Sequence, residues 1–95
     1  MIIRLVKMTF IPEKSDVFLE LFAASKSKIS GSEGCIHLEL HREAGKDNVF
    51  FTISHWDSAE SLEGYRKSEL FSSVWAKTKI HFLEKPQTWT LTGSL

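Results

Sequence analysis

The stretch HWDSAESLEGYRKSELFSSVW, from His55 to Trp75, decides the fold because it joins the end of a strand to a helix that starts twice. Trp56 closes an alternating run, and Asp57 or Ser58 then offers a side chain that can cap a helix. Ser68 offers a second cap further along. The stretch therefore predicts a helix in two pieces, packed against a sheet.

Side-chain periodicity predicts the remaining elements. Strands are expected where side chains alternate between two faces, and helices where apolar residues recur every three or four positions. The expected elements are a strand over 2–11, a helix over 13–29, strands over 35–42 and 49–56, the two-piece helix, and a strand over 88–93. This order indicates an α+β protein with a ferredoxin-like βαββαβ fold and a four-stranded antiparallel sheet.

One face of this sheet is expected to be left without helices. Right-handed crossovers place both helical segments on the same face. Every strand carries some apolar or neutral side chains on both alternating sets, so the other face would expose a large patch. We expect a second copy of the chain to cover it, sheet against sheet, in a homodimer.

Composition limits the classes of protein. The chain has 95 residues, 42% hydrophobic and 25% charged, which predicts a single domain over residues 1–95. Its formal net charge is zero, so nucleic acid is not an expected partner. No apolar run reaches the roughly 20 residues that cross a bilayer, so no membrane association and a cytoplasmic location are expected. The single cysteine cannot form an internal disulfide.

The opening stretch resembles a family motif. Trp56, Ser58, Leu62, Tyr65 and the segment SELF at 68–71 fit the pattern W-x-[ST]-x-x-x-[LF]-x-x-[HWY]-x-x-S-x-x-F of the antibiotic biosynthesis monooxygenase (ABM) domains. A Gly-Cys pair opening the second strand and a proline before the last strand also fit. The resemblance covers nearly the whole chain and implies a dimeric α+β barrel. It leaves the reaction open, because the family includes cofactor-free monooxygenases, haem-degrading enzymes and signal-turnover enzymes.

Several positions differ from branches of that family. Tyr65 and Trp75 stand where the haem-degrading members carry Trp and His, and the first strand lacks their Asn. Haem degradation is therefore disfavoured, because the axial ligand is missing. Many other members carry a Glu where this chain has Ser54, and a His at the position of Tyr65. The resemblance consequently supplies no acid-base residue by position.

The aromatic residues of the opening stretch allow two interpretations. Trp56, Tyr65, Phe71 and Trp75 could line a cavity for a flat phenol or quinol, or could simply belong to the core, as aromatic stripes at helical spacing usually do. A buried Tyr65 hydroxyl needs a partner and could hold a substrate oxygen. His55 and His37 are candidate bases because histidine titrates near neutrality. Strand neighbours point to opposite faces, so His55 is not expected to share a pocket with Trp56.

The second strand has a set of titratable side chains. Alternation places Cys35, His37, Glu39 and His41 on one face. The two histidines would be roughly 13 Å apart at their Cα atoms, so no metal site is expected without a bulge. A polar dimer face or a partly wet cavity wall fits better. Arg4 could pair with Glu39 in the interface, which we favour, or meet an anionic substrate oxygen.

Two functions remain after these exclusions. No G-x-S-x-G elbow or glycine-rich phosphate loop is present, which argues against hydrolases and nucleotide-binding proteins. The first hypothesis is a cofactor-independent monooxygenase acting on a phenolic, quinol or polycyclic aromatic molecule. The second is a non-catalytic small-molecule-binding or assembly domain with the same fold. The candidate residues for catalysis are His55, His37 and Tyr65, and those for substrate binding are Trp56, Phe71, Trp75 and Arg4.

Overall fold

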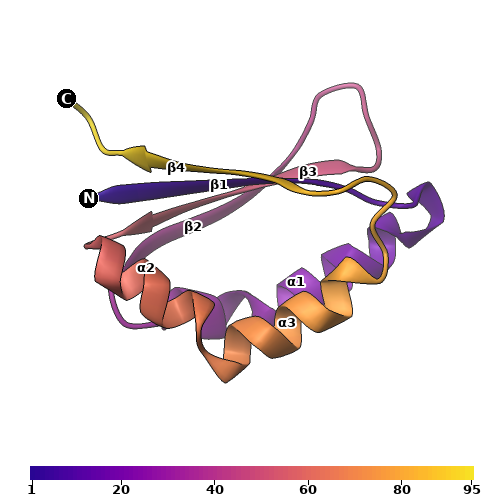
Figure 1. Cartoon of the computed structure of the whole chain (residues 1–95). Coiled ribbons are helices and arrows are strands. Elements are labelled where there is room, and N and C mark those ends of the chain that lie inside the picture. Colours follow the sequence, from indigo (N-terminus) through magenta and orange to yellow (C-terminus); the bar gives the residue numbers. More distant parts are fainter.

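The computed structural model describes residues 1–95 as one sheet with helices on one side (Figure 1). The elements are β1 (Ile2–Thr9), a short 3-10 helix η1 (Pro12–Lys14), α1 (Ser15–Ser30), β2 (Cys35–Arg42), β3 (Val49–Trp56), α2 (Ala59–Arg66), α3 (Glu69–Lys79) and β4 (Gln87–Thr92). The α+β class and the ferredoxin-like order of elements are confirmed. None of the helices combines the length and the apolar character that crossing a bilayer requires.

The first strand of the chain lies inside the sheet. The strand order is β2-β3-β1-β4, and each neighbouring pair is antiparallel. Arg4 on β1 pairs with Ser54 on β3 and with Thr90 on β4. Directly paired residues point to the same face of a sheet. These three polar side chains therefore lie together, on the face that the helices cover.

The opposite face of the sheet has no helix on it. Figure 1 shows α1, α2 and α3 all on one side of the four strands. Leu5 pairs with Ile53 and with Trp89, so these apolar side chains point to the other side. Trp89 is 43% exposed and Leu91 is 44% exposed. Both crossovers thus leave the same face uncovered, as their right-handedness predicts.

The hydrophobic core lies between α1 and the covered face of the sheet. Phe18 of α1 stacks on Phe10 with ring centroids 4.3 Å apart, and its centroid lies 5.2 Å from that of Phe50. Met8 and Phe22 belong to the same buried cluster. Aromatic pairs of this kind contribute about 0.5–1.5 kcal/mol each beyond the burial of their area. These contacts hold α1 against the covered face of the sheet.

Two serine caps divide the second helical segment. The Ser58 hydroxyl accepts a hydrogen bond from the backbone N–H of Ser61 at 3.1 Å, and α2 begins there. The Ser68 hydroxyl accepts one from the N–H of Phe71 at 3.1 Å, and α3 begins there. The two-piece helix is confirmed, and of the two possible caps Ser58 is the one used.

A β-bulge changes the face of the sheet to which the first residue of β2 points. Cys35 pairs with Trp56 and His37 pairs with His55, so two steps along β2 match one step along β3. The extra residue, Ile36, is 57% exposed. Cys35 therefore faces the helices while His37 faces away from them. The expectation that Cys35 shares a face with His37 is wrong, because strict alternation does not hold through a bulge.

The turn before β2 brings the backbone close to α2. Gly34 has a φ of +82°, and a Cβ at this position would overlap the side chain of Ser61. The Gly34 carbonyl also accepts a hydrogen bond of 2.9 Å from the N–H of Asp57. Gly45, in the β2–β3 hairpin, also has a φ of +82°, but a Cβ there would meet nothing within 4 Å. The two glycines thus share a backbone conformation and differ in their surroundings.

This pair allows the close approach to be measured separately from backbone strain. Gly45→Ala is expected to lower the free energy of unfolding by about 1 kcal/mol, because a Cβ is strained at positive φ. Gly34→Ala adds a steric overlap and is expected to cost roughly 1–3 kcal/mol more. Urea denaturation followed by circular dichroism measures both variants. Equal losses would show that the contact between Gly34 and Ser61 does not constrain the fold.

Candidate functional site

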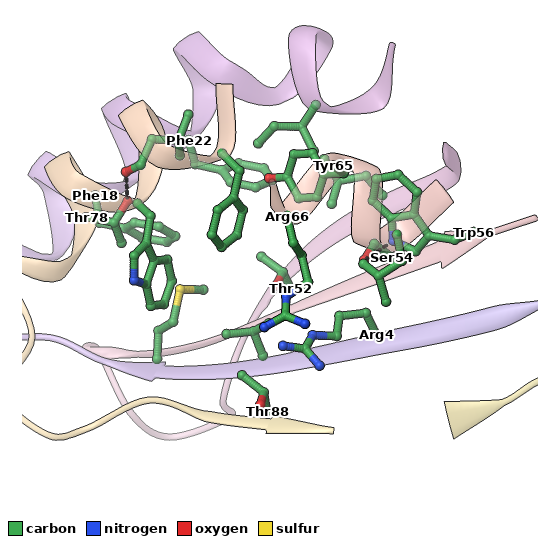
Figure 2. A pocket seen from close by; sticks show the side chains of 18 residues that line it. Arg4, Phe18, Phe22, Thr52, Ser54, Trp56, Tyr65, Arg66, Thr78 and Thr88 are labelled. Atoms are coloured by element: carbon green, nitrogen blue, oxygen red, sulfur yellow. Dashed lines mark hydrogen bonds between the residues drawn. The ribbon is translucent and has the colours of Figure 1, made fainter. Parts of the chain in front are cut away.

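A cavity lies between the sheet and the helices (Figure 2). Its volume is about 350 Å³, and 12 of its 18 lining residues are hydrophobic. Its walls come from the covered face of the sheet and from α1, α2 and α3. Ligand pockets typically measure about 300–1,000 Å³, so this cavity suits a compact molecule.

Four aromatic side chains form a continuous wall of the cavity. Trp56 stacks on Tyr65 with centroids 5.1 Å apart, and Tyr65 meets the edge of Phe71 at 5.3 Å. Phe71 in turn stacks on Trp75 at 5.8 Å, with an interplanar angle of 11°. All four line the cavity. Both interpretations of this stretch thus apply in part, since Trp56 is fully buried and the other three are half-buried.

The orientation of Trp56 is set by a buried hydrogen bond. Its indole Nε1–H donates to the hydroxyl of Ser54 at 3.0 Å (Figure 2). Ser54 lies two residues earlier on β3, on the same face, and also lines the cavity. The bond satisfies the single polar atom of the indole, so Trp56 presents only apolar surface to a ligand.

Tyr65 places a neutral hydroxyl at the cavity. Burial raises the pKa of Tyr65 from its ordinary value of 10.0 to about 12, and the nearby Cys35 contributes to the increase. Burial likewise raises the pKa of the Cys35 thiol. Both groups are therefore protonated near neutral pH. The Tyr65 hydroxyl can donate a hydrogen bond to an anionic oxygen, but the high pKa makes it a poor base.

Two arginines enter the cavity from opposite layers. Arg4 comes from β1 and Arg66 from the end of α2, and Figure 2 shows their guanidinium groups converging. Arg4 Nη1 donates to the Thr90 hydroxyl at 2.6 Å. Burial lowers the pKa of Arg4, the charge of Arg66 lowers it further, and Glu63 opposes the change. The favoured pairing of Arg4 with Glu39 is wrong, because Glu39 pairs with Ile53 and lies on the other face of the sheet.

The residue that the sequence analysis missed is Arg66. Its only signal was a position four residues after Leu62, which places it on the buried stripe of α2. An arginine at the end of a short helix is usually explained by the favourable interaction of its charge with the helix dipole near the C-terminus. The charge also lies close to another arginine, which only the packing of α2 over β1 reveals.

His37 and His55 lie on the uncovered face of the sheet. They are direct partners across β2 and β3, and their ring centroids are 5.7 Å apart. The sheet itself separates both rings from the cavity on its other side. Neither histidine is placed to take a proton from a ligand in this cavity. The expectation that one of them is the base therefore fails for a ligand bound there, because alternation sends their side chains away from the helices.

The histidines instead belong to a cluster around Glu39. Its carboxylate contacts His37 Nε2 at 3.0 Å and His41 Nε2 at 2.8 Å. The hydrogen bond to His41 is the main cause that lowers the pKa of Glu39, and the bond to His37 acts in the same direction. No group of three or more His, Cys, Asp or Glu side chains is arranged to hold a metal ion. This cluster is the polar part of the uncovered face.

The ionisation of Tyr65 can be observed directly, because it is the only tyrosine in the chain. In the folded protein the phenolate is expected to form near pH 12, and in denaturant near pH 10. Between these values the folded chain keeps a proton that the unfolded chain releases, so the free energy of unfolding should fall as pH rises. Absorbance at the phenolate band, with circular dichroism in parallel, provides the measurement. Ionisation near pH 10 with the fold intact would contradict the burial of this hydroxyl.

Comparison with known structures gives close similarity in shape and low identity in sequence. An antibiotic biosynthesis monooxygenase matches with a TM-score of 0.92 and 17% identity, covering 100% of both chains. A conserved protein from Methanosarcina mazei Go1 matches with a TM-score of 0.89 and 21% identity, over 96% of this chain and 91% of the other. A protein from Mycobacterium tuberculosis matches with a TM-score of 0.89 and 14% identity, over 98% and 94% of the two chains. At these identities the similarity shows the fold alone.

Sequence comparison identifies the family. A search of curated proteins gives no match. The family model described as antibiotic biosynthesis monooxygenase, ABM, matches residues 1–77. This region includes β1 to β3, α2, most of α3 and the four-residue aromatic wall. The chain therefore belongs to the antibiotic biosynthesis monooxygenase family.

Proposed function

We propose that this protein is a cofactor-independent monooxygenase that oxidises a compact phenolic, quinol or anthrone-like aromatic molecule in the cavity. The observation that carries the proposal is the presence of one neutral phenol donor, Tyr65, in a wall that is otherwise aromatic and apolar. A flat substrate would lie against Trp56, Phe71 and Trp75 and direct its oxygen to Tyr65. Membership of the ABM family supports a monooxygenase or small-molecule-binding role.

The reaction balances without a redox cofactor, since the substrate itself supplies the electrons. For an anthrone, the ring methylene becomes a carbonyl and dioxygen is reduced. One oxygen atom forms the new C=O bond, and the other leaves as water with the two methylene hydrogens. The four electrons come from the two C–H bonds. The protein needs only to exclude water, orient the ring and stabilise the electron-rich anion that reacts with dioxygen.

In this proposal Tyr65 stabilises the substrate anion and does not generate it. A hydrogen bond from its hydroxyl to the substrate oxygen favours the ionised form and lowers the pKa of the substrate. The positive charge of Arg4 acts in the same direction. The substrate proton can then pass to solvent at the cavity opening.

A binding protein without catalysis is the second candidate. The observation that favours it is the set of titratable residues lining the cavity, which consists of Tyr65, Arg4 and Arg66. None of them is a carboxylate or an imidazole that could act as a general base near neutral pH. A cavity of this kind can hold an aromatic anion without turning it over.

Oxygen consumption distinguishes the two candidates. The purified protein is expected to accelerate oxygen uptake with a panel of quinols and anthrones, equally with and without added haem. Tyr65→Phe should lower kcat by roughly 100-fold, as the loss of one donor to a reacting anion does in other sites. Ser72→Ala is the matched control, because it removes an exposed hydroxyl on α3 outside the cavity.

One result would contradict the enzyme proposal, and two would contradict its mechanism. A panel without acceleration favours the binding protein. Unchanged turnover in Tyr65→Phe would show that this hydroxyl does not stabilise the reacting anion. A loss of activity in His37→Ala or His55→Ala, with fold and oligomeric state retained, would require a base on the other face of the sheet.

We also propose that the uncovered sheet face is the interface of a homodimer. Leu5, Ile53, Trp89 and Leu91 supply its apolar surface. Exposed apolar patches of this kind on soluble proteins usually mark an interaction site. The cluster around Glu39 would then lie in the interface, where paired polar groups fix the register of the two sheets.

The dimer is expected to appear in light scattering as twice the 10.9 kDa mass of one chain at micromolar concentration. Leu91→Asp should weaken association by at least about tenfold, because it places a charge in the apolar face. Leu83→Asp is the control, since Leu83 is also exposed, at 58%, but lies outside the strands. A monomeric wild-type protein would rule out the dimer, and equal effects of both variants would rule out this face.

A further inference from the structure

We propose that Arg4 and Arg66 form an anion-binding pair and that the ligand of the cavity is an aromatic acid. Its carboxylate would be held between the two guanidinium groups, and its ring would lie along the wall formed by Trp56, Tyr65 and Phe71. This inference rests on the proposed function for the location of the site. It goes further by assigning the charge of the ligand and the residues that select it.

The arrangement of the two arginines is unusual for a cavity whose walls are mainly apolar. One comes from the central strand and the other from the helix layer, and both guanidinium groups point to the same space (Figure 2). Two like charges placed close together repel each other, and partial burial strengthens the repulsion. Burial is the main cause that lowers the pKa of Arg4, and the charge of Arg66 lowers it further. An anion between them would remove this cost.

The charges of the pair are not balanced by the protein inside the cavity. No carboxylate is among the lining residues. Arg4 donates to the neutral hydroxyl of Thr90, and the residue across from it on β3 is the neutral Ser54. Glu63 is the carboxylate that acts on the pair: it contacts Arg66 at 3.3 Å and opposes the lowering of the pKa of Arg4. It lies on the surface, however, with the side chains of Arg66 and Glu63 43% and 51% exposed. An exposed pair of this kind contributes little, so both guanidinium groups keep donors for a ligand.

The chemistry of the pair and the wall defines the ligand class. A guanidinium presents two parallel N–H donors that match the two oxygens of a carboxylate. The stacked rings of Trp56, Tyr65 and Phe71 offer flat apolar surface for an aromatic system. The volume of about 350 Å³ restricts that system to a compact one. A carboxylate on a compact aromatic system, up to the three fused rings of an anthrone, meets all three conditions.

The test compares 2-naphthoate with 2-naphthamide, which has nearly the same shape but no charge. Isothermal titration calorimetry at pH 7 should show 2-naphthoate binding at least about tenfold more tightly to the wild-type protein. Arg4→Met and Arg66→Met each keep an unbranched apolar stem and remove the charge. Each should reduce the preference several-fold, and the double variant should abolish it. Lys67→Met is the control, because it removes an equal charge next to Arg66 without lining the cavity.

Each result has a defined meaning once circular dichroism has shown that the variants fold. Equal affinity for the acid and the amide overturns the anion site, while the aromatic cavity of the proposed function stands. A preference that survives in the double variant, or falls equally in Lys67→Met, overturns the assignment to Arg4 and Arg66. Binding of neither compound overturns both the anion site and the aromatic pocket. A retained preference without oxygen uptake upholds the anion site and contradicts only the enzyme.

Discussion

The alternation of side chains along β1 is the constraint on which the rest of this structure depends. β1 pairs on both sides, with β3 and with β4, so its register orients three strands at once. Arg4 faces the helices together with Ser54 and Thr90, and Leu5 faces away from them. A shift of one residue would exchange these sets and put the cation on the exposed face. The cavity and the uncovered face are thus two consequences of one register.

The break between α2 and α3 determines why a cavity exists on the covered face. A continuous helix would keep one straight apolar stripe against the sheet. The cap at Ser68 starts a new helix, and the aromatic residues on either side of it form a chain of rings that runs across the break. Phe18, Phe22 and Met8 of the core cluster under α1 also line this cavity. The aromatic rings therefore lie at the edge of the cavity beneath the break and do not fill it.

The order and approximate bounds of the elements could be predicted from the sequence, because each is a local pattern. The strands Cys35–Arg42 and Val49–Trp56 alternate clearly, and two serines mark the helix starts. The face to which Cys35 points could not be predicted, because a bulge depends on how β2 fits against β3. The position of Arg66 beside Arg4 depends in the same way on the packing of one layer over another.

The candidate site was predictable in its aromatic part only. Trp56, Tyr65, Phe71 and Trp75 follow one another at strand-end and helical spacings, which is visible in the sequence, and the structure brings them together. The histidines were attractive because of their usual pKa. Alternation alone already separated His55 from Trp56, and the pairing of His37 with His55 places both on the uncovered face. The histidines are chemically suited to act as bases, but they do not share a face of the sheet with the aromatic residues. Residue type alone therefore did not locate the site.

The two faces of the sheet carry different polar groups. The cavity is lined by the neutral Tyr65 hydroxyl and by two arginines, and no carboxylate lines it. The uncovered face carries Glu39 with its contacts to His37 and His41. Substitutions in this cluster would therefore act on the proposed dimer interface, whereas substitutions of Arg4 and Arg66 would act on the ligand.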